Sequence, residues 1–287
     1  MNEIKPEFIK KVIRRAIRRE EKRDLVTFLA ELSKISKQKI KHAMICGAVW
    51  RKSEGKGKLL RVRKATSQVL LGDWIEMHFD EDILGREVAP AELVYEDRSW
   101  GIWYKPSGML AQGNEFGDHL SLLRQVEKIK GEAFLVHRLD REVAGLMLVA
   151  YHHKEAAAFS KLWQSGGVQK IYRALVQGNI AQTQGSLSGV IRDSLDGQEA
   201  ITHYKVLKPD TYESLVEIEI KTGRYHQIRR HFLFLGHAIM GDPRYGSGNK
   251  NDDGLQLFAY SLKFKEPLRG RQIEVTLPST FLPSSFI

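Results

Sequence analysis

One carboxylate stands among positive charges in the stretch HRLDRE, where Asp140 lies between Arg138 and Arg141. An apolar run, GLMLVA, follows directly at residues 145–150. A carboxylate beside guanidinium groups can act as a nucleophile or a general base, although it is more often half of a structural ion pair. The residue types therefore mark Asp140 as a candidate catalytic acid without deciding its role.

Three further clusters carry side chains that could assist such a carboxylate. They are WYKPSGMLAQ at residues 103–112, QKIYRALVQG at 169–178, and IKTGRYHQIRRHFLFLGHAIMGDPRYG at 220–246. Tyr172 stands in an alternating segment, where a core position is the default. Arg229 stands in a helical pattern, where exposure is the default. Each cluster alone is weak evidence for a catalytic site, and only their combination is specific.

Cofactor chemistry finds no support in the sequence. His152 and His153 are adjacent, His226 and His231 are five residues apart, and none of these four has a cysteine or carboxylate at ligand spacing, so we expect no metal. The GxSxG string of serine hydrolases is absent, as is a Gly-rich phosphate loop. We therefore expect no cofactor.

Short strands and helices alternate from residue 92 onward. Alternating patterns occur in LVYEDRSWGIWYKP, KIYRALVQG, HYKVLK and SLVEIEIKTG, and helical spacing occurs at residues 120–130, 153–163 and 224–235. Strands outnumber helices, and their half-buried faces suit antiparallel pairing. We predict an α+β fold, with a mixed, mainly antiparallel sheet in a catalytic domain at residues 92–287.

The N-terminal part is predicted to form a smaller domain. Apolar residues at helical spacing, with Lys and Arg between them, predict a basic amphipathic helix over residues 1–23. Two short helices should follow, the second capped by Ser36 and ended by Gly47. Strands are expected near residues 48–51, 59–63 and 74–79. This domain would span residues 24–80, and a linker at 81–91 would join it to the catalytic domain.

The net charge of +10 is concentrated near the N-terminus. Residues 1–64 hold 20 Lys or Arg and 7 Asp or Glu, a charge of +13, whereas the remainder holds 25 and 28, a charge of −3. Such asymmetry predicts a polyanionic partner, either a nucleic acid or an acidic membrane surface. No apolar run approaches the roughly 20 residues of a membrane span, and the single Cys46 excludes an internal disulfide. We expect a soluble, cytoplasmic monomer with no membrane partner.

In this order, the four clusters resemble the RluA-type family of RNA pseudouridine synthases, from about residue 92 to the C-terminus. The most specific part is HRLDR…GLMLVA, followed by KIYRALVQG and TGRYHQIRRH…GHAIMGDPRYG. The resemblance implies the pseudouridine synthase fold, and for Asp140 the role of catalytic carboxylate. It implies that Arg138 fills the gap left by the flipped uridine. It also implies that Tyr172 packs on the extruded base and that Arg229 is the ion partner of Asp140.

Residues 24–79 resemble the S4-type RNA-binding module, through their apolar spacing and the strings GAV and GDWIEM. The resemblance implies an αL-type domain whose second helix faces RNA phosphates. The candidate RNA-binding residues of this module are Lys37, Lys39, Lys41 and Arg51.

The chain departs from the RluA pattern at four positions. The usual RxTSG is REVAG here, with Val143 and Ala144 in place of two hydroxyl residues. The usual GRTHQIR is GRYHQIR here, with Tyr225 in place of threonine. The usual LHA is LFA here, with Phe258 in place of histidine. These changes spare the proposed catalytic positions and alter the residues that surround them.

The implied reaction detaches uracil at N1, turns the base and rejoins it to ribose C1′ through C5. An enzyme doing this must extrude the base from the RNA stack. Asp140 could attack C1′ or remove a proton on the way to a glycal, and the sequence leaves both open. Ribosomal RNA is the expected substrate, with transfer RNA as the alternative.

Two other function classes compete with this interpretation. A non-catalytic RNA-binding or ribosome-assembly factor could keep the fold, but the intact Asp140, Tyr172 and Arg229 argue against it. A glycoside-type hydrolase would need a second carboxylate to activate water. We expect no such carboxylate in these motifs.

Overall fold

The computed structural model describes residues 9–18, 23–249 and 251–287. The chain divides into two compact units, the first formed by Met1–Val88 and Gln112–Gln125 and the second by Ala89–Ala111 and Val126–Ile287. The first break therefore falls inside the expected linker. The inclusion of residues 112–125 in the N-terminal unit was not predicted from the sequence.

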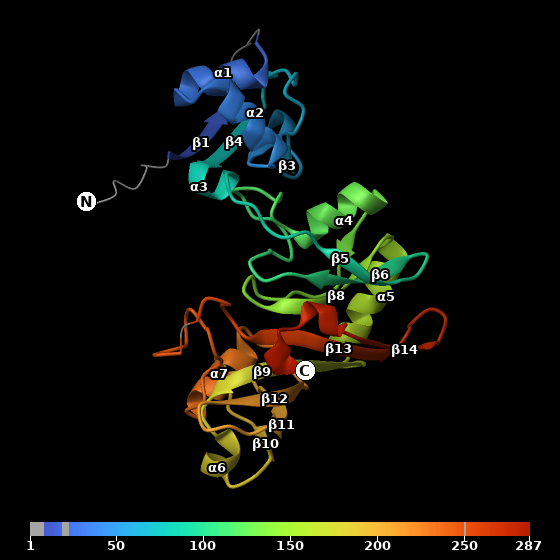
Figure 1. Ribbon diagram of the computed structural model, residues 1–287. Helices are drawn as coiled ribbons and strands as arrows, with labels where there is room; N and C mark the ends of the chain where they lie inside the picture. Colours follow the sequence, from blue (N-terminus) through green and yellow to red (C-terminus); the bar gives the residue numbers. More distant parts are fainter. Residues whose placement is uncertain (1–8, 19–22, 250) are drawn as a thin grey trace, which may run out of the picture. The chain divides into compact units, whose positions relative to one another are not determined.

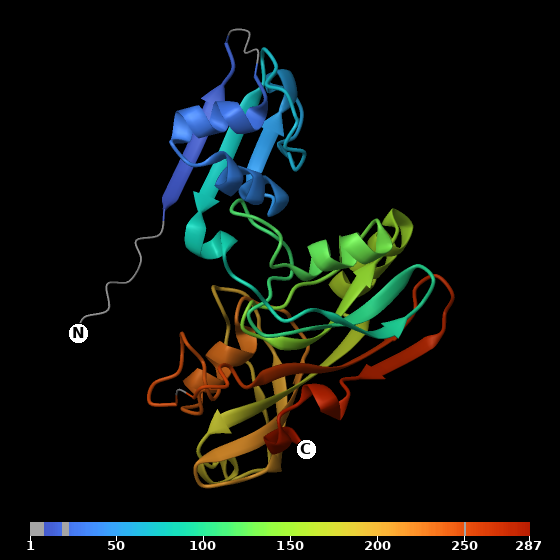
Figure 2. The same ribbon diagram turned by 45° about the horizontal axis from the view of Figure 1, so that its top comes forward.

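The N-terminal unit is a four-stranded antiparallel sheet of order β1-β4-β2-β3. In Figure 2 the helices α1 and α2 lie on one face of this sheet. Buried residues of both helices form one apolar core with Val49, Ile75 and Met77 of the strands. The elements are β1 (Lys10–Ala16), α1 (Leu25–Ser33), α2 (Lys37–Ile45), β2 (Val49–Lys52), η1 (Ser53–Gly55), β3 (Leu60–Arg61), β4 (Trp74–Asp80) and α3 (Glu81–Leu84).

The ends of α2 match the sequence prediction. The backbone N–H of Lys39 donates to Ser36 Oγ at 3.4 Å, which caps the first turn. Gly47 follows the helix with φ +81°, a conformation that glycine adopts without steric cost. Asp24 caps α1 in the same way, because its Oδ1 accepts from Thr27 N at 2.9 Å.

The amphipathic helix predicted over residues 1–23 is wrong where the structure describes it. Lys10–Ala16 form strand β1, which pairs with β4 along its whole length. Ile13 and Ile17 are four residues apart, so they share one face in a helix and in a strand alike. Ile9 and Val12, which a helix would have buried beside them, are 40% and 46% exposed. Residues 1–8 and 19–22 of this prediction lie outside the described residues.

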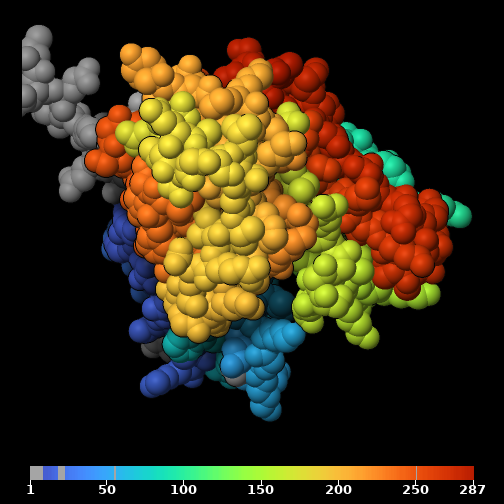
Figure 3. All heavy atoms as spheres, turned by 90° about the horizontal axis from the view of Figure 1, so that it is seen from below, coloured from blue at the N-terminus to red at the C-terminus, as the bar shows by residue number. Residues whose placement is uncertain are grey.

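The second unit is built on a ten-stranded sheet of order β10-β11-β12-β9-β13-β8-β6-β5, with β14 paired to β13 and β7 to β8. Figure 1 shows β9, β12, β11 and β10 side by side, and Figure 3 shows their surface in yellow to orange beside the red C-terminal residues. The strands are β5 (Glu92–Glu96), β6 (Trp100–Lys105), β7 (Phe134–Leu135), β8 (Ala144–Ala150), β9 (Val168–Gln177), β10 (Ser188–Ile191), β11 (Thr202–Lys208), β12 (Glu213–Ile220), β13 (Leu257–Lys265) and β14 (Gln272–Thr276). The helices are α4 (Leu122–Lys130), α5 (His153–Gln164), α6 (Ile180–Gln184), α7 (Gln227–Phe234), η2 (Ser279–Phe281) and η3 (Ser284–Phe286).

Strand pairing confirms the predicted α+β class with a mixed, mainly antiparallel sheet. Among the described strands, the pairing of β8 with β13 is the parallel one, and the other paired strands run antiparallel. The three helical segments predicted in the catalytic domain correspond to α4, α5 and α7, with no end shifted by more than three residues. Within the described ranges, no helix is both long and apolar enough to span a bilayer.

Two of the departures from the family pattern are direct neighbours in this sheet. Ala144 of β8 lies opposite Phe258 of β13, and both are buried. The Phe258 ring packs edge-on against Phe286, with ring centroids 4.8 Å apart. An apolar pair therefore stands where the family pattern has a serine and a histidine. The two changes compensate each other, because neither leaves a buried polar group without a partner.

Candidate active site

Asp140 lies in the loop between β7 and β8, and this loop is tied to the end of β6. The buried ammonium of Lys105 donates to three carbonyl oxygens, among them those of Met109, at 2.8 Å, and Arg141, at 3.2 Å. Burial lowers the pKa of Lys105 to about 7, and the charges of Glu142 and Asp140 oppose this fall. Lys105 therefore anchors the backbone directly after Asp140.

The sheet register brings Tyr172 toward the same place. Gly145 of β8, Ala259 of β13 and Tyr172 of β9 form one row across three adjacent strands. Gly145 has φ +124°, and a Cβ atom there would lie 2.4 Å from the carbonyl oxygen of Ala259, so only glycine fits. Burial raises the pKa of Tyr172, and the nearby charge of Asp140 raises it further. Tyr172 therefore keeps its phenol protonated beside the carboxylate.

Arg229 reaches the site from α7 and is only 2% exposed. Its Nη1 lies 3.5 Å from Asp140 Oδ2, within ion-pair distance. Its two short bonds, however, go to Asp242, since Nε donates to Oδ2 and Nη2 donates to Oδ1, each at 2.7 Å. Arg229 is thus shared by the two aspartates, and the buried Asp242 holds it by a bidentate contact.

The ionisation of this pair follows from its surroundings. Burial alone would raise the pKa of Asp242, but the hydrogen bonds from Arg229 and from backbone N–H groups outweigh it and lower that pKa. Burial alone would lower the pKa of Arg229, whereas the hydrogen bonds and charge of Asp242, and then the charge of Asp140, raise it. Both groups therefore stay charged, and the guanidinium is fixed with Nη1 directed at Asp140.

His226 is the fourth group around the carboxylate. Its Nε2 lies 3.4 Å from Asp140 Oδ2 and 3.2 Å from Arg229 Nη1, and its Nδ1 lies 3.1 Å from Tyr245 Oη. Burial lowers its pKa, while the charge of Asp140 opposes the shift. The residue precedes α7 with φ +52°, a left-handed conformation that is costly without glycine and is commonest at functional sites. His226 is thus held in place by contacts that compensate this strain.

A second carboxylate lies beside Asp140, contrary to our expectation for these motifs. Glu142 Oε2 lies 3.7 Å from Arg229 Nη1, the same nitrogen that faces Asp140. The side chains of Asp140 and Glu142 are 29% and 26% exposed, so both are open to solvent. The site therefore contains the two carboxylates that a glycoside-type hydrolase would need.

The structure places Asp140 and Arg229 within ion-pair distance, and Tyr172 lies near enough for the charge of Asp140 to raise its pKa. Arg138 lies two residues from Asp140 with an exposed side chain. The candidate RNA-binding lysines of α2, which belong to the N-terminal unit, are all exposed: Lys37, Lys39 and Lys41. Lys39 is paired with Glu81. Arg51 is 29% exposed and lies 3.8 Å from the buried Asp73.

Sequence reasoning missed Lys105, Glu142, His226 and Asp242, although all four lie in the quoted clusters. The signal for Asp242 was its place in GDPRYG, thirteen residues after Arg229, a separation at which no local rule predicts contact. His226 was considered only as a metal ligand. In the described part of the chain, no group of three His, Cys, Asp or Glu side chains could hold a metal ion.

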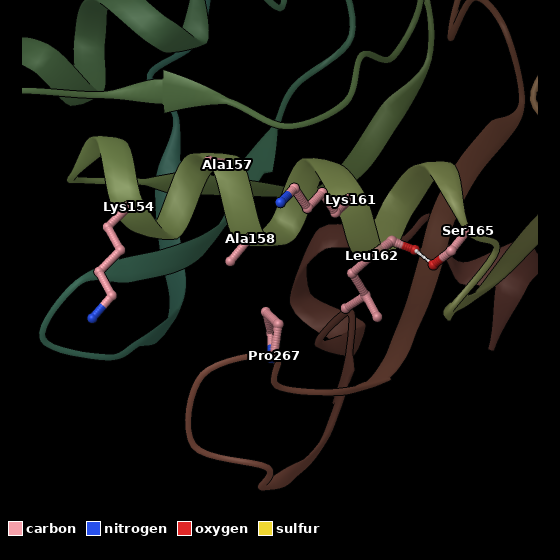
Figure 4. A pocket seen from close by; sticks show the side chains of 7 residues that line it. All are labelled: Lys154, Ala157, Ala158, Lys161, Leu162, Ser165 and Pro267. Carbon is pink, nitrogen blue, oxygen red and sulfur yellow. Dashed lines mark hydrogen bonds between the residues drawn. The ribbon is translucent and has the colours of Figure 1, made fainter.

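A surface hollow of about 540 Å³ lies elsewhere in the second unit, on α5. Figure 4 shows Ala158 and Leu162 on the side of the helix toward Pro267, and Lys154, Ala157, Lys161 and Ser165 complete the lining. None of its lining residues belongs to the Asp140 cluster. It is therefore separate from the candidate active site.

Comparison with known proteins identifies the class. Residues 100–234 match the family described as RNA pseudouridylate synthase. An uncharacterised RNA pseudouridine synthase of Bacillus subtilis (strain 168) is 32% identical over 234 residues, covering 72% of this chain and 80% of that protein. The chain therefore belongs to the RNA pseudouridine synthase family and is an isomerase that acts on RNA.

Two further proteins show which type within the family this chain resembles. Ribosomal large subunit pseudouridine synthase D of Zymomonas mobilis is 31% identical over 216 residues, covering 64% of this chain and 68% of that protein. The solved structure of human RNA pseudouridylate synthase domain containing 1 has a TM-score of 0.55 at 26% identity, covering 69% of this chain and 86% of that one. Resemblance to the RluA type is therefore confirmed, and some relatives are named for ribosomal RNA.

Proposed function

We propose that this enzyme converts specific uridines to pseudouridine in structured ribosomal RNA and that Asp140 is its catalytic carboxylate. The observation that carries the proposal is the position of the Asp140 carboxylate. It is partly exposed, whereas the guanidinium 3.5 Å away is almost fully buried. A swung-out nucleotide can therefore reach the carboxylate but not its ion partner.

The neighbouring groups have separable roles in this proposal. Arg229, fixed by Asp242, supplies a positive charge that favours the anionic form of a carboxylate and remains in place throughout the reaction. Tyr172 offers a flat face for the extruded uracil and a neutral phenol beside the sugar. The exposed Arg138 enters the gap that the base leaves and also contacts phosphate.

The N-terminal unit would hold the RNA. The exposed lysines of α2 and the resemblance to S4 modules support a role in phosphate binding, with Lys37 and Lys41 as its main contacts. Lys39 and Arg51 are weaker candidates, because each is paired with a carboxylate. The enzyme would work as a monomer in the cytoplasm, without metal or cofactor.

Ribosomal RNA is favoured over transfer RNA by the relatives that are named for the large ribosomal subunit. A non-catalytic assembly factor is the less supported alternative, because the complete cluster around Asp140 would then have no use.

The proposal is tested by mapping pseudouridines in total RNA from a strain that lacks this gene. We expect pseudouridine to be missing from one or a few positions in ribosomal RNA and to return with the wild-type gene but not with Asp140→Asn. Loss at transfer RNA positions alone would redirect the substrate assignment. Restoration by Asp140→Asn would refute the role of the carboxylate. The two carboxylates of Asp140 and Glu142 could also serve a hydrolase, which would release free uracil. Absence of free uracil from the reaction would exclude that activity.

A further inference from the structure

We propose that Tyr225 and Arg244 form a subsite for the nucleotide next to the target uridine, in which Tyr225 stacks on the base and Arg244 contacts a phosphate. The proposal deepens the proposed function and rests on it. It assigns a role to the tyrosine that replaces threonine in the family pattern GRTHQIR.

The Tyr225 ring is backed by a neighbouring ring and is largely open to solvent. It stacks on His226, with ring centroids 3.8 Å apart and an interplanar angle of 19°. The residue is nevertheless 58% exposed, one of the most exposed large apolar side chains among the described residues. A flat aromatic face that is backed by another ring and open to solvent suits a nucleobase, because every base can stack on it.

The stacked rings of Tyr225 and His226 lie directly beside the Asp140 carboxylate. The backing residue, His226, has a side chain only 8% exposed, and its Nε2 lies 3.4 Å from Asp140 Oδ2. Tyr225 is thus connected to Asp140 through one residue, His226, which stacks on Tyr225 and contacts the carboxylate. A base on Tyr225 would therefore lie within a nucleotide's reach of the ribose at Asp140.

Arg244 supplies the charge that a nucleotide would need. Its Nη1 donates to Tyr225 Oη at 3.0 Å, and its guanidinium carbon lies 5.8 Å and 5.5 Å from the ring centroids of Tyr225 and Tyr245. The side chain is exposed, and no described carboxylate is recorded within ion-pair distance of it. An arginine oriented by a tyrosine hydroxyl but lacking a counterion is suited to a phosphate oxygen.

Base extrusion explains the need for such a subsite. When the target uridine leaves the stack, its neighbours lose a stacking partner, and that loss opposes binding. A base held on Tyr225 regains a stacking contact, which typically strengthens binding by about tenfold or more. A threonine at this position has no ring and could not provide this contact.

The test uses a short RNA stem-loop that contains the uridine mapped in the deletion strain, made with an abasic residue at the preceding or the following position. For the intact RNA, Tyr225→Ala should raise KM about tenfold and leave kcat within about twofold, and Tyr225→Phe should retain most of the affinity. With wild-type enzyme, one of the two abasic RNAs should raise KM by a similar factor. The same abasic RNA should have little further effect on Tyr225→Ala, because the two changes remove one contact.

Arg244→Gln provides a second, independent readout. It should raise KM and reduce the slope of log affinity against log salt by roughly 0.7 to 0.9, the value for one phosphate contact. Thermal unfolding of each variant should be nearly unchanged, since both side chains are exposed.

The outcomes separate this proposal from the one on which it depends. If the wild-type enzyme forms pseudouridine but neither abasic position couples to Tyr225→Ala, the subsite is refuted and the proposed function stands. A fall in kcat without coupling would instead assign Tyr225 to support of His226. If no pseudouridine is missing from the RNA of the deletion strain, the proposed function fails and the subsite fails with it.

Discussion

At the residue scale, the central feature is one guanidinium shared by several carboxylates. Arg229 makes two bonds of 2.7 Å to the buried Asp242, and its remaining nitrogen faces Asp140 and Glu142 at 3.5 and 3.7 Å. This division lets Asp242 fix the arginine while Asp140 stays accessible. Asp242 therefore acts on the chemistry indirectly, by positioning Arg229.

Replacement of Arg229 should damage both stability and rate. Arg229→Gln leaves the charge of Asp242 buried without its partner, which typically costs about 3–5 kcal/mol of unfolding free energy. The rate should fall by about 100-fold or more, because a positive charge beside Asp140 is lost. Denaturant unfolding and single-turnover rates at saturating RNA measure the two effects separately.

A matched double variant separates the two roles. Asp242→Asn in the Arg229→Gln background removes the unpaired charge, so it should recover much of the stability and none of the rate. Recovery of activity together with stability would show that Arg229 serves the fold alone.

At the element scale, the loop that carries Asp140 is fixed to its surroundings at both ends. Before Asp140, His137 Nε2 accepts a hydrogen bond from Leu148 N of β8 at 3.0 Å, and its ring stacks on Trp163 of α5 with centroids 4.1 Å apart. After Asp140, Lys105 anchors the backbone of Arg141. The loop is thus held against the sheet and α5 on both sides of Asp140.

This anchoring predicts a specific acid sensitivity. Burial lowers the pKa of His137 to about 3, from the ordinary value of 6.5. Between pH 6.5 and 3, His137 is therefore protonated in the unfolded chain but not in the folded protein. The free energy of unfolding consequently falls as the pH falls through this range. Relative to His137→Gln, which can still accept from Leu148 N, the wild type should lose on the order of 1 kcal/mol per pH unit between pH 6 and 4.

The measurement is chemical denaturation at a series of pH values. His152→Gln is the control, and its curve should follow the wild type because His152 is exposed. Parallel curves for the wild type and His137→Gln would contradict the neutral state of His137.

The elements that the sequence predicted well are those with local signals. Ser36 and Gly47 mark the ends of α2 through capping and a left-handed turn, which depend on neighbouring residues alone. β1 was mistaken for a helix because Ile13 and Ile17 fit both periods, and only pairing with β4, about sixty residues later in the chain, decides between them. Long-range pairing has no local signature.

The same distinction holds for the site. The motifs named Arg229 as the ion partner of Asp140, and the two lie 3.5 Å apart. The bond of Arg229 to Asp242 depends on how the loop after α7 folds back, which no local pattern predicts. The compensating pair of Ala144 and Phe258 also lies in distant segments, so it could be recognised only from the register of β8 and β13.

At the scale of the whole molecule, the N-terminal unit carries more positive charge than the larger second unit, +7 against +3, and its excess lies in residues 1–64. Asp118, from the segment at residues 112–125, pairs with Arg61 and Arg63 of this unit. Deletion of residues 1–80 would therefore strip Asp118 of its partners as well as removing positive charge. Point substitutions give a cleaner test.

We expect Lys37→Gln with Lys41→Gln to weaken RNA binding and to reduce the salt slope by about one to two, because each lysine neutralises one phosphate. The rate at saturating RNA should change little. Lys263→Gln is a control of matched chemistry in the second unit, on a lysine that is paired with Glu274 at 2.9 Å. Equal effects of the control and the α2 lysines would show that net charge alone drives binding.

The most direct test of the central claim is the release of tritium from RNA labelled at uridine C5, measured under single-turnover conditions with enzyme in excess. That hydrogen must leave when C5 joins the sugar, so its release reports the isomerisation itself. With Asp140→Asn we predict no release above the rate without enzyme, while affinity for the RNA stays within a few fold of the wild type. Release by Asp140→Asn at a rate near that of the wild type would contradict the assignment of this carboxylate to the chemistry.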